Sequence, residues 1–427
     1  MTTDFVHDME KRGLVHQVTD ATLRDEMLRT PFTAYIGFDP TAASLHVGSL
    51  LPVLSLARLQ RAGHRPIALV GGGTGLIGDP SGKESERPML TKEKLAENAA
   101  GLRSQLERFL DFGGERGAVL IDNAEWLCEL NLLDFLRDIG KHFSVNAMVA
   151  RDSVRVRLES RDQGISYTEF SYSLLQAYDF LELYDRYGCR LQMGGSDQWG
   201  NIVAGSDLIR RLRGVTAYGL TSPLMTRSDG KKFGKSEQGN VWLDANLTSP
   251  YELYQFWLNT EDGDVVRSLK GFTFLGLEEI ADLAAAVESR PERREAQRVL
   301  AAEVTRLVHG GDALARAEHT TRVLFEGEDL AGLTDQELIE AFAHSPSTPL
   351  PRAALGTAEA GLVAVAAASG LAPSRGQART AVAAGGIYVN NRRVEEPAYL
   401  LCAADVVAGQ FVVLRRGKRS YHVVRLV

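Results

Sequence analysis

The chain is poor in cysteine and has no long apolar run. Cys128, Cys189 and Cys402 are the three cysteines among 427 residues, and they stand far apart without any CxxC pair. An odd, scattered set of this kind favours neither a disulfide framework nor a thiolate metal site. No segment approaches the roughly 20 continuous apolar residues that span a bilayer, and the first residues, MTTDFVHDMEKRG, lack a basic region followed by an apolar run. We therefore expect a cytoplasmic protein with reduced cysteines, no membrane segment and no protein-bound structural metal.

Charge is unevenly distributed along the chain. The formal net charge is −7, yet from Arg375 onward nine Arg or Lys stand against three Asp or Glu, which leaves −13 for the rest. The stretch SPSTPLPRAALGTAEA, residues 345–360, precedes this basic tail, and its prolines and small polar residues predict a linker. With 44% hydrophobic residues, a chain of this length is expected to hold two or three domains.

The first two hundred residues alternate between short apolar runs and helical patterns. The runs TAYIGFD, RPIALV, GAVLIDN and GCRLQMGG predict strands, and LHVGSLLPVLSLARLQRAGH carries Leu50, Val53, Leu54 and Ala57 at helical spacing. Alternation of this kind predicts a parallel sheet with helices on both faces, in which ligands bind at the carboxyl ends of the strands. From about Ser249 onward the pattern becomes helical.

Two common nucleotide-binding motifs are incomplete. The stretch GTGLIG, residues 73–78, fits GxGxxG after a strand, but GDPSGKESERP follows where a dinucleotide fingerprint needs a helix. The sequence GDPSGKE also fails as a phosphate loop, because its glycines are one residue too close and Glu84 replaces the magnesium-binding hydroxyl. A nicotinamide-dependent dehydrogenase is therefore disfavoured.

Two other segments suit a triphosphate. In GFDPTAASLHVGSLLP a strand ends at Asp39, and the chain enters a helix through HVGS, residues 46–49. A helix N-terminus offers unpaired N–H groups, and Gly48 carries no side chain that would keep a nucleotide from the backbone. The second segment, MTRSDGKKFGKSEQG at 225–239, gathers Lys231, Lys232 and Lys235 around glycines. Such a segment is ordinarily a solvated loop, unless another site in the chain needs positive charge.

The two segments together resemble the signatures of class I aminoacyl-tRNA synthetases. HVGS resembles their HIGH motif, and KFGKS, residues 232–236, resembles their KMSKS loop. Ser49 stands where the final histidine is usual, which leaves open whether Ser49 donates the same hydrogen bond, and Phe-Gly replaces Met-Ser. The stretches YIGFDPT, TGLIGDPSGK, SYTEFSYSLLQAYDF and LQMGGSDQWGNI extend the resemblance over nearly the whole chain, to tyrosyl-tRNA synthetases of the bacterial type.

The resemblance implies roles for individual residues. The L-tyrosine site would comprise Tyr35 and Asp179 at the phenol, Asp79, Tyr172 and Gln176 at the ammonium group, and Gln198 at the carboxylate. The ATP site would comprise Gly37, Asp39, His46, Gly48, Gly195, Asp197, Lys235 and Ser236, with a magnesium ion accompanying ATP as substrate. The catalytic set would comprise Thr41, His46, Ser49, Lys83, Arg87, Lys232 and Lys235. Tyr172, Gln176 and Asp179 stand at i, i+4 and i+7, on one face of a helix.

The basic tail completes the resemblance. LAPSRGQARTAVAAGGIYVNNRRV resembles the RNA-binding fold of ribosomal-protein S-four type, in which Arg375, Arg379, Arg392 and Arg393 would bind RNA phosphates. The implied fold class is α/β: a Rossmann-like parallel-sheet nucleotide-binding domain (1–247), a helical tRNA-binding domain (248–344), the linker, and a small C-terminal α+β RNA-binding domain (361–427).

The resemblance also implies an activity and an assembly. The chain would be a ligase that activates L-tyrosine with ATP and transfers it to tRNA-Tyr. It would act as a homodimer, since the family places the segment GKHFSVNAMVARDSV at a subunit interface. The alternative is a noncatalytic RNA-binding protein on a synthetase fold, because fold alone does not establish function.

Overall fold

The computed structural model divides the chain into two compact units. It describes residues 4–81, 90–150, 154–155, 158, 164–226, 233–236, 239–326, 330–342, 345–417 and 420–427. The first unit comprises Met1–Asp244 and Thr260–Leu300, and the second comprises Ala245–Asn259 and Ala301–Val427. Among these described residues, no helix is long and apolar enough to cross a membrane.

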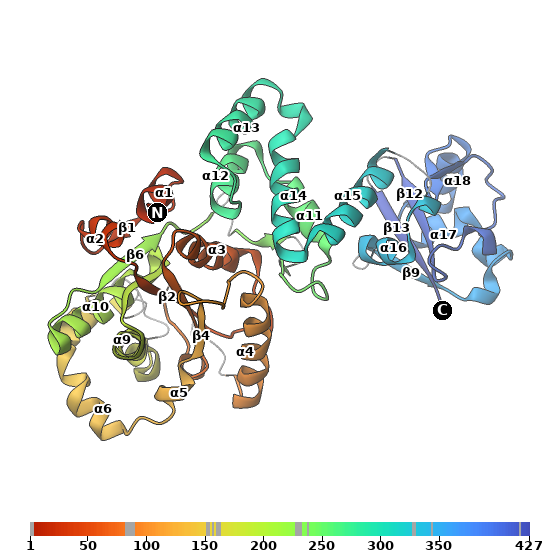
Figure 1. Ribbon diagram of the computed structural model, residues 1–427. Helices are drawn as coiled ribbons and strands as arrows, with labels where there is room; N and C mark the ends of the chain where they lie inside the picture. Colours follow the sequence, from red (N-terminus) through yellow and green to blue (C-terminus); the bar gives the residue numbers. More distant parts are fainter. Residues whose placement is uncertain are drawn as a thin grey trace. The chain divides into compact units, whose positions relative to one another are not determined.

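A six-stranded sheet of order β1-β6-β5-β2-β3-β4 forms the centre of the first unit (Figure 1). Its strands are β1 (Gln17–Val18), β2 (Thr33–Phe38), β3 (Arg65–Val70), β4 (Val119–Asp122), β5 (Cys189–Gly195) and β6 (Tyr218–Ser222). All are parallel except β1, which pairs antiparallel with β6 at one edge. The strand order steps outward in both directions from the β2–β5 pair, so right-handed crossovers place helices on both faces. The carboxyl ends of β2 and β5 therefore meet at the switch point where ligands bind in such sheets.

The first unit also contains helices, several of which pack on this sheet. They are α1 (Phe5–Lys11), α2 (Leu23–Arg29), α3 (Val47–Arg61), α4 (Lys92–Leu106), α5 (Ala124–Leu127), α6 (Leu132–Asp138), α7 (Val145–Val149), α9 (Tyr167–Tyr187), α10 (Trp199–Arg213), α12 (Asp262–Phe272) and α13 (Leu277–Ser289). The helix α3 packs on β2 and β3, whereas α9 packs on α10 and β5. Ser166 begins α9 by accepting a hydrogen bond from the backbone N–H of Glu169, and Gly188 ends it in the left-handed conformation at φ 63°.

The predicted alternation of strands and helices is confirmed. The four predicted strand runs correspond to β2, β3, β4 and β5, and the HVGS helix corresponds to α3. The GTGLIG stretch forms only a short 3-10 turn, Thr74–Leu76, and the next helix among the described residues begins at Lys92. The glycine run therefore does not lead into the helix that a dinucleotide fingerprint requires.

The second unit contains a five-stranded sheet of order β11-β10-β12-β13-β9. Its strands are β9 (Ser347–Leu350), β10 (Ile387–Val389), β11 (Arg392–Val394), β12 (Phe411–Arg416) and β13 (Ser420–Leu426). Its helices are α11 (Pro250–Leu258), α15 (Gly311–Glu326), α16 (Asp335–Phe342), α17 (Leu362–Ala368) and α18 (Arg375–Ala383). Val412 and Leu414 of β12 join a core with α17 and α18, whereas Phe411 and Val413 join a core with α15 and α16. Both faces of the sheet are therefore covered.

The structure differs from the predicted division of residues 248–360. The helical stretch predicted as one domain falls partly in each unit, because α12 packs on α3 whereas α11 packs on α15 and α16, and the boundary lies within α14 (Glu295–His309). The predicted linker 345–360 contains β9, which pairs in parallel with β13. Its prolines therefore do not mark a free linker, since an edge strand tolerates proline where no ladder N–H is needed.

Candidate active site

A cavity of about 640 Å³ opens at the carboxyl ends of the central strands. Its walls come from β2, β5 and β6, the first turns of α3, and one face of α9. Most residues assigned to tyrosine or ATP from the sequence lie around this one cavity: Tyr35, Gly37, Asp39, Thr41, Gly48, Ser49, Asp79, Tyr172, Gln176, Asp179, Gly195, Asp197 and Gln198.

Tyr35 and Asp179 form the most buried part of the cavity wall. Each side chain is 1% exposed. The Tyr35 ring packs on Phe180 at a centroid distance of 5.3 Å, and its hydroxyl has no hydrogen-bond partner among the described residues. A buried hydroxyl without a partner carries a desolvation cost of about 1–3 kcal/mol, which a ligand offering a polar group would remove.

The Asp179 carboxylate is held by two donors. Trp126 donates through Nε1 to Oδ1 at 2.7 Å, and Asn123 donates through Nδ2 to Oδ2 at 2.9 Å. Burial raises the pKa of Asp179 to about 7, although both hydrogen bonds act against the shift. Burial, followed by the charge of Asp179, raises the pKa of Tyr35 well above its ordinary value, so the Tyr35 phenol stays neutral. The floor of the cavity thus pairs a neutral hydroxyl with a carboxyl group that titrates near neutral pH.

Asp39 extends the acidic region along the cavity. The Tyr172 hydroxyl donates to its Oδ2 at 3.1 Å, and Thr74 donates to its Oδ1 at 2.9 Å. Burial raises the pKa of Tyr172 well above its ordinary value, and the charges of Asp39, Asp79 and Asp179 add to this shift. Three carboxylates around one neutral phenol make a region suited to a small cation such as a primary ammonium group.

A network of amide side chains borders this acidic region. Gln198 donates to Asp79 at 2.7 Å and accepts from Gln176 at 3.2 Å. Asn201 of α10 donates to Gln176 at 3.1 Å and to Ser81 at 3.3 Å. Asp197 is exposed at the rim. These hydrogen bonds hold the amide groups of Gln176 and Gln198 in fixed orientations beside the cavity.

The first turn of α3 is capped by its own histidine. His46 accepts a hydrogen bond at Nδ1 from the backbone N–H of Gly48 at 3.0 Å. Burial lowers the pKa of His46, which favours the neutral ring that can accept this bond. A Cβ at position 48 would lie 2.7 Å from the His46 ring, so glycine is required there. The N–H groups of Val47, Gly48 and Ser49 therefore all have partners within the protein, so the unpaired N–H groups expected from the sequence are not found in this turn.

The two signature segments contact each other. Gly234 of KFGKS has φ +86°, and a Cβ on it would lie 3.2 Å from the backbone N of Gly48. The backbone N–H of Val241 donates to Gly234 at 3.1 Å, and that of Val47 donates to Val241 at 2.9 Å. The KFGKS backbone thus packs directly on the turn that HVGS forms.

Some predicted site residues fall outside this geometry. Lys83, Arg87 and Lys232 lie outside the described residues, and of Lys235 and Ser236 the structure describes only the backbone, as β7 paired with β8 (Gly239–Asn240).

The cavity also contains polar residues that the sequence analysis missed. Asn123 follows β4 directly, so the rule that ligand groups gather at the carboxyl ends of strands could have found it. Gln192 lies inside β5, is buried, and leaves its Oε1 without a partner in the described part of the chain. No sequence signal marks Gln192, because a single polar residue within an apolar strand run does not by itself indicate a functional role. Thr74 and Ser81, which also line the cavity, were missed as well, as were Trp126 and Asn201, which do not line it but donate hydrogen bonds to Asp179 and Gln176.

The four arginines predicted to bind RNA lie on the surface of the second unit. Arg392 pairs with Asp405 at 3.6 Å, and Arg393 pairs with Glu395 at 2.9 Å. Arg375 and Arg379 are exposed on α18, and within the described residues neither has an ion-pair partner. A pair of exposed, unpaired guanidinium groups is the arrangement most available to an external phosphate.

Comparisons with known families and proteins agree with this geometry. Residues 27–326 match the family of tRNA synthetases class I (W and Y), and residues 339–424 match the tyrosine–tRNA ligase SYY-like C-terminal domain. A tyrosine–tRNA ligase of Roseiflexus castenholzii is 53% identical over 426 residues, covering 100% of both chains. A tyrosine–tRNA ligase of Geobacillus stearothermophilus is 50% identical over 428 residues, covering 99% of each.

Solved structures show the same fold. A C-terminally truncated mitochondrial tyrosyl-tRNA synthetase of Aspergillus nidulans aligns with a TM-score of 0.69 and 34% identity, covering 76% of this chain and 94% of its own. A tyrosyl-tRNA synthetase of Archaeoglobus fulgidus complexed with L-tyrosine aligns with a TM-score of 0.55 at 18% identity, covering 74% of this chain and 99% of its own, which shows the fold alone.

Proposed function

The chain belongs to the class I tRNA synthetases of the tryptophan and tyrosine family and is a tyrosine–tRNA ligase, and from this premise we propose how its cavity divides the work among its residues. The observation that carries the proposal is the buried Tyr35 hydroxyl, which has no partner among the described residues and lies in the same cavity wall as Asp179. A substrate phenol placed between them would accept a hydrogen bond from the Tyr35 hydroxyl and donate one to the Asp179 carboxylate. Tryptophan, whose indole N–H only donates, could not satisfy both groups.

The remaining tyrosine contacts follow the charges along the cavity. The substrate ammonium group would lie between Tyr172, Gln176 and Asp79, where carboxylates favour a cation. Gln198, which already donates to Asp79 at 2.7 Å, would orient toward the substrate carboxylate when that carboxylate arrives. L-tyrosine would therefore lie with its ring against β2 and its carboxylate toward the first turn of α3.

ATP would occupy the opposite end of the cavity. The positive end of the α3 dipole would favour its phosphates beside Gly48 and Ser49, with Thr41 and His46 near the γ-phosphate. Gly37, Asp39, Gly195 and Asp197 would border the nucleoside, and magnesium would enter bound to ATP. The tyrosine carboxylate would attack the α-phosphate, the bond to the β-phosphate would break, and pyrophosphate would leave. Lys83, Arg87, Lys232 and Lys235 would stabilise the charge that develops on pyrophosphate.

The test is ATP–pyrophosphate exchange by the purified chain with single amino acids. Exchange should depend on tyrosine and should be far slower with phenylalanine or tryptophan at equal concentration. Exchange that tryptophan supports as well as tyrosine, or the absence of exchange with all three, would contradict the proposal.

The second unit would bind tRNA-Tyr and present its 3′ end for transfer. Arg375 and Arg379 on α18 would contact phosphates first, and Arg392 and Arg393 would join them by exchanging their carboxylate partners for phosphate. We further propose that the enzyme works in the cytoplasm.

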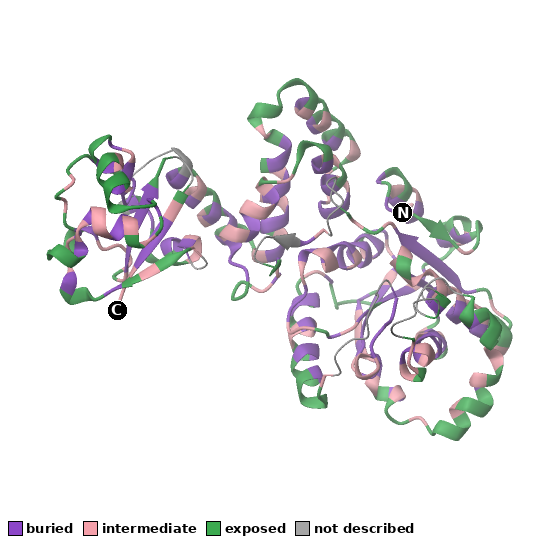
Figure 2. Cartoon of the chain, turned by 180° about the vertical axis from the view of Figure 1, so that it is seen from behind, coloured by how far each residue is buried: buried purple, intermediate pink, exposed green. Residues whose placement is uncertain are grey.

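We also propose a homodimer through α6 and α7. The helix α6 buries none of its residues, and Leu132 and Leu133 are 68% and 75% exposed, while Val145 of α7 is 61% exposed (Figure 2). Neighbouring exposed apolar side chains mark an interaction surface, and a twofold pairing of identical surfaces is the commonest arrangement. Light scattering at micromolar concentration should give twice 46.7 kDa, and Leu133→Glu should reduce it to 46.7 kDa. A wild-type protein of 46.7 kDa would rule out the dimer.

A further inference from the structure

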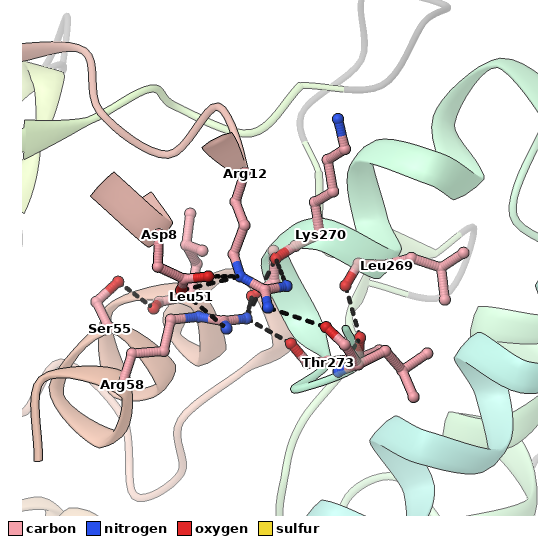
Figure 3. Close-up of polar contacts among 10 residues, drawn as sticks. Asp8, Arg12, Leu51, Ser55, Arg58, Leu269, Lys270 and Thr273 are labelled. Carbon is pink, nitrogen blue, oxygen red and sulfur yellow. Dashed lines mark hydrogen bonds and ion pairs between the residues drawn. The ribbon is translucent and has the colours of Figure 1, made fainter. Parts of the chain in front are cut away.

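A buried ionic cluster joins α1, α3 and α12 in the first unit (Figure 3). Asp8 of α1 accepts from Nε of Arg12 at 2.9 and 3.0 Å, and Arg58 of α3 lies 3.9 Å from Asp8. Figure 3 shows both guanidinium groups turned toward the end of α12. Both arginines are buried, so their charges must be matched within the protein.

The cluster binds the last carbonyl groups of α12. Arg58 donates to the carbonyl oxygens of Lys270 at 3.1 Å, Gly271 at 3.4 Å and Thr273 at 2.5 Å. Arg12 donates to the carbonyl oxygens of Lys270 at 3.5 Å and Leu275 at 2.9 Å. The last carbonyls of a helix have no intrahelical partner and carry the negative end of its dipole, so two cations satisfy them well. Burial lowers the pKa of Arg58 to about 9, which leaves it charged at neutral pH. The end of α12 is therefore fixed to α3, the helix whose first turn is HVGS.

The helix α12 also contacts the chain on both sides of residues 227–232, at Thr226 before them and at Phe233 of KFGKS after them. Before them, Arg267 donates to the backbone oxygen of Thr226 and pairs with Asp264 at 3.0 Å. After them, the Phe233 ring stacks on Phe272, with centroids 5.1 Å apart and planes inclined by 11°. Phe272 is fully buried and is not among the residues that line the cavity, whereas Phe233 lines it.

We propose that α12 is the platform that positions the KFGKS segment, with Phe272 as the residue that transmits the position. Phe272 holds Phe233, and the adjacent Gly234 then meets the first turn of α3 at Gly48. Arg12 and Arg58 fix the platform to the same helix that carries HVGS. Phe272 is a positioning residue, because it acts on the reaction through Phe233 and touches neither substrate. The inference rests on the proposed function, since it assumes that KFGKS acts on ATP.

The expected effect follows from geometry. A catalytic group displaced by about 1 Å can cost up to about a hundredfold in rate. A leucine at position 272 keeps an apolar contact but loses the flat ring on which Phe233 stacks. We expect a loss of about tenfold in the rate of adenylate formation, with tyrosine affinity unchanged within about twofold, because the tyrosine contacts lie on β2 and α9.

A double-mutant cycle on the full chain tests the inference. Phe233→Leu, Phe272→Leu and the double variant are compared by single-turnover adenylate formation and by equilibrium dialysis with tyrosine. Each single variant should lose about tenfold in rate, and the double variant should be no slower than the slower single variant, since both changes remove one contact. Phe233→Tyr keeps the ring and should therefore lose less of the rate than Phe233→Leu.

The matched control is Phe342→Leu in the second unit. Phe342 is likewise buried and pairs with an aromatic ring, that of Tyr421 at 5.9 Å, but it lies outside the first unit. The Phe342→Leu variant should have the wild-type rate of adenylate formation. If Phe272→Leu does not fold, Arg267→Ala, whose side chain is 45% exposed, tests the other contact and should lower the rate about threefold with tyrosine affinity retained.

Three outcomes overturn the inference. The first is a folded Phe272→Leu protein with the wild-type rate, and the second is a double variant whose losses multiply. The third is a loss of tyrosine affinity in parallel with rate, because that is the result of general damage to the cavity. If the unmodified chain shows no tyrosine-dependent exchange, the proposed function fails instead, whatever the variants do.

Discussion

The two units place their functional polar groups in opposite environments. In the first unit, Tyr35 and Asp179 are each 1% exposed, and Trp126 and Asn123 already hold the carboxylate. In the second unit, Arg375 and Arg379 are exposed on α18 without an ion-pair partner among the described residues. Buried groups discriminate sharply, because a ligand that lacks the matching atom leaves them unpaired in a dry site. Exposed charges discriminate little, but they bind a large polyanion with an affinity that depends on salt.

The largest effect is expected from a truncation that keeps the first unit and removes the exposed arginines of the second. A chain ending at Glu326 should keep tyrosine-dependent exchange within about twofold, while charging of tRNA falls by about a thousandfold or more, because the phosphate contacts are lost. The cut belongs before α16, since Phe342 and β9 are part of the second unit's packing and a cut near Gly356 would leave β9 without its partner β13. Exchange and charging are measured on the same preparations.

A full-length double variant sharpens this test. Arg375→Ala together with Arg379→Ala should weaken tRNA binding and reduce its salt dependence, with exchange intact. Equal loss of exchange and charging in the truncated chain would show that the two units do not divide the work as proposed.

The next largest effect is expected in the KFGKS segment. Lys235→Ala removes a charge that we propose acts on departing pyrophosphate, so adenylate formation should slow by about a hundredfold, corresponding to about 3 kcal/mol, while the affinities for tyrosine and ATP change little. Rapid quenching with labelled ATP gives the rate and equilibrium dialysis the affinities. Lys231→Ala, one residue outside KFGKS, is the control and should retain the rate. Weaker ATP binding at an unchanged rate would make the segment a passive clamp.

A smaller effect is expected at the cavity floor. Tyr35→Phe removes the unpaired hydroxyl, so tyrosine affinity should fall by about tenfold and the preference for tyrosine over phenylalanine should narrow. Competition between the two amino acids in the exchange assay measures the preference. Tyr178→Phe is the matched control, because the Tyr178 hydroxyl donates to Glu182 at 2.6 Å and does not line the cavity. An unchanged preference in Tyr35→Phe would remove Tyr35 from substrate selection.

The smallest effect is a shift with pH. Burial raises the pKa of Asp179 to about 7 in the folded protein, above its model-peptide value of 3.8. This group therefore stabilises the empty fold most at low pH, and its contribution is lost as the pH rises through about 7. Tyrosine, by donating its phenol proton to the ionised form, should bind more tightly as the pH rises through the same range.

Trp126→Phe offers a check on the cause of that pH dependence. It removes a donor that favours the ionised carboxylate, so the midpoint of tyrosine binding should move to higher pH. Dissociation constants measured between about pH 5.5 and 8.5 would give both midpoints. A tyrosine affinity independent of pH in both proteins would show that Asp179 does not titrate in this range.

Much of the first unit could be predicted because its signals are local. Short apolar runs ended by Asp39 or by glycines predict parallel strands, and the spacing of Tyr172, Gln176 and Asp179 on one helix face predicts side chains that share a cavity. The contacts that hold these groups were not predictable in the same way. Trp126 reaches Asp179 across 53 positions of sequence, and periodicity carries no information about such pairs.

The division of the chain was harder to predict than its elements. The helical patterns of α11, α12 and α14 are alike in sequence, yet α12 packs with the first unit and α11 with the second. The unit that each helix joins depends on the surface against which it packs and not on its amphipathic pattern. For α12 that surface carries Arg12 and Arg58, which bind the carbonyl groups at its end. The strand β9 within the proline-rich stretch 345–360 was not predicted for a related reason. A short edge strand has too few residues to show an alternating pattern.

The position of β13 in the second sheet has a consequence for how the chain is made. Within the described part of the chain β9 pairs with β13 alone, and β13 lies between β9 and β12, although 69 residues separate Leu350 from Ser420. During synthesis β9 therefore emerges long before the strand that it needs, and its edge stays open until the residues of β13 leave the ribosome. A nascent chain interrupted before Ser420 would carry a finished first unit beside an unclosed second sheet. Such a product could form tyrosyl-adenylate but could not offer a completed surface to tRNA, so translation errors near the 3′ end of the message would yield enzymes that spend ATP without charging.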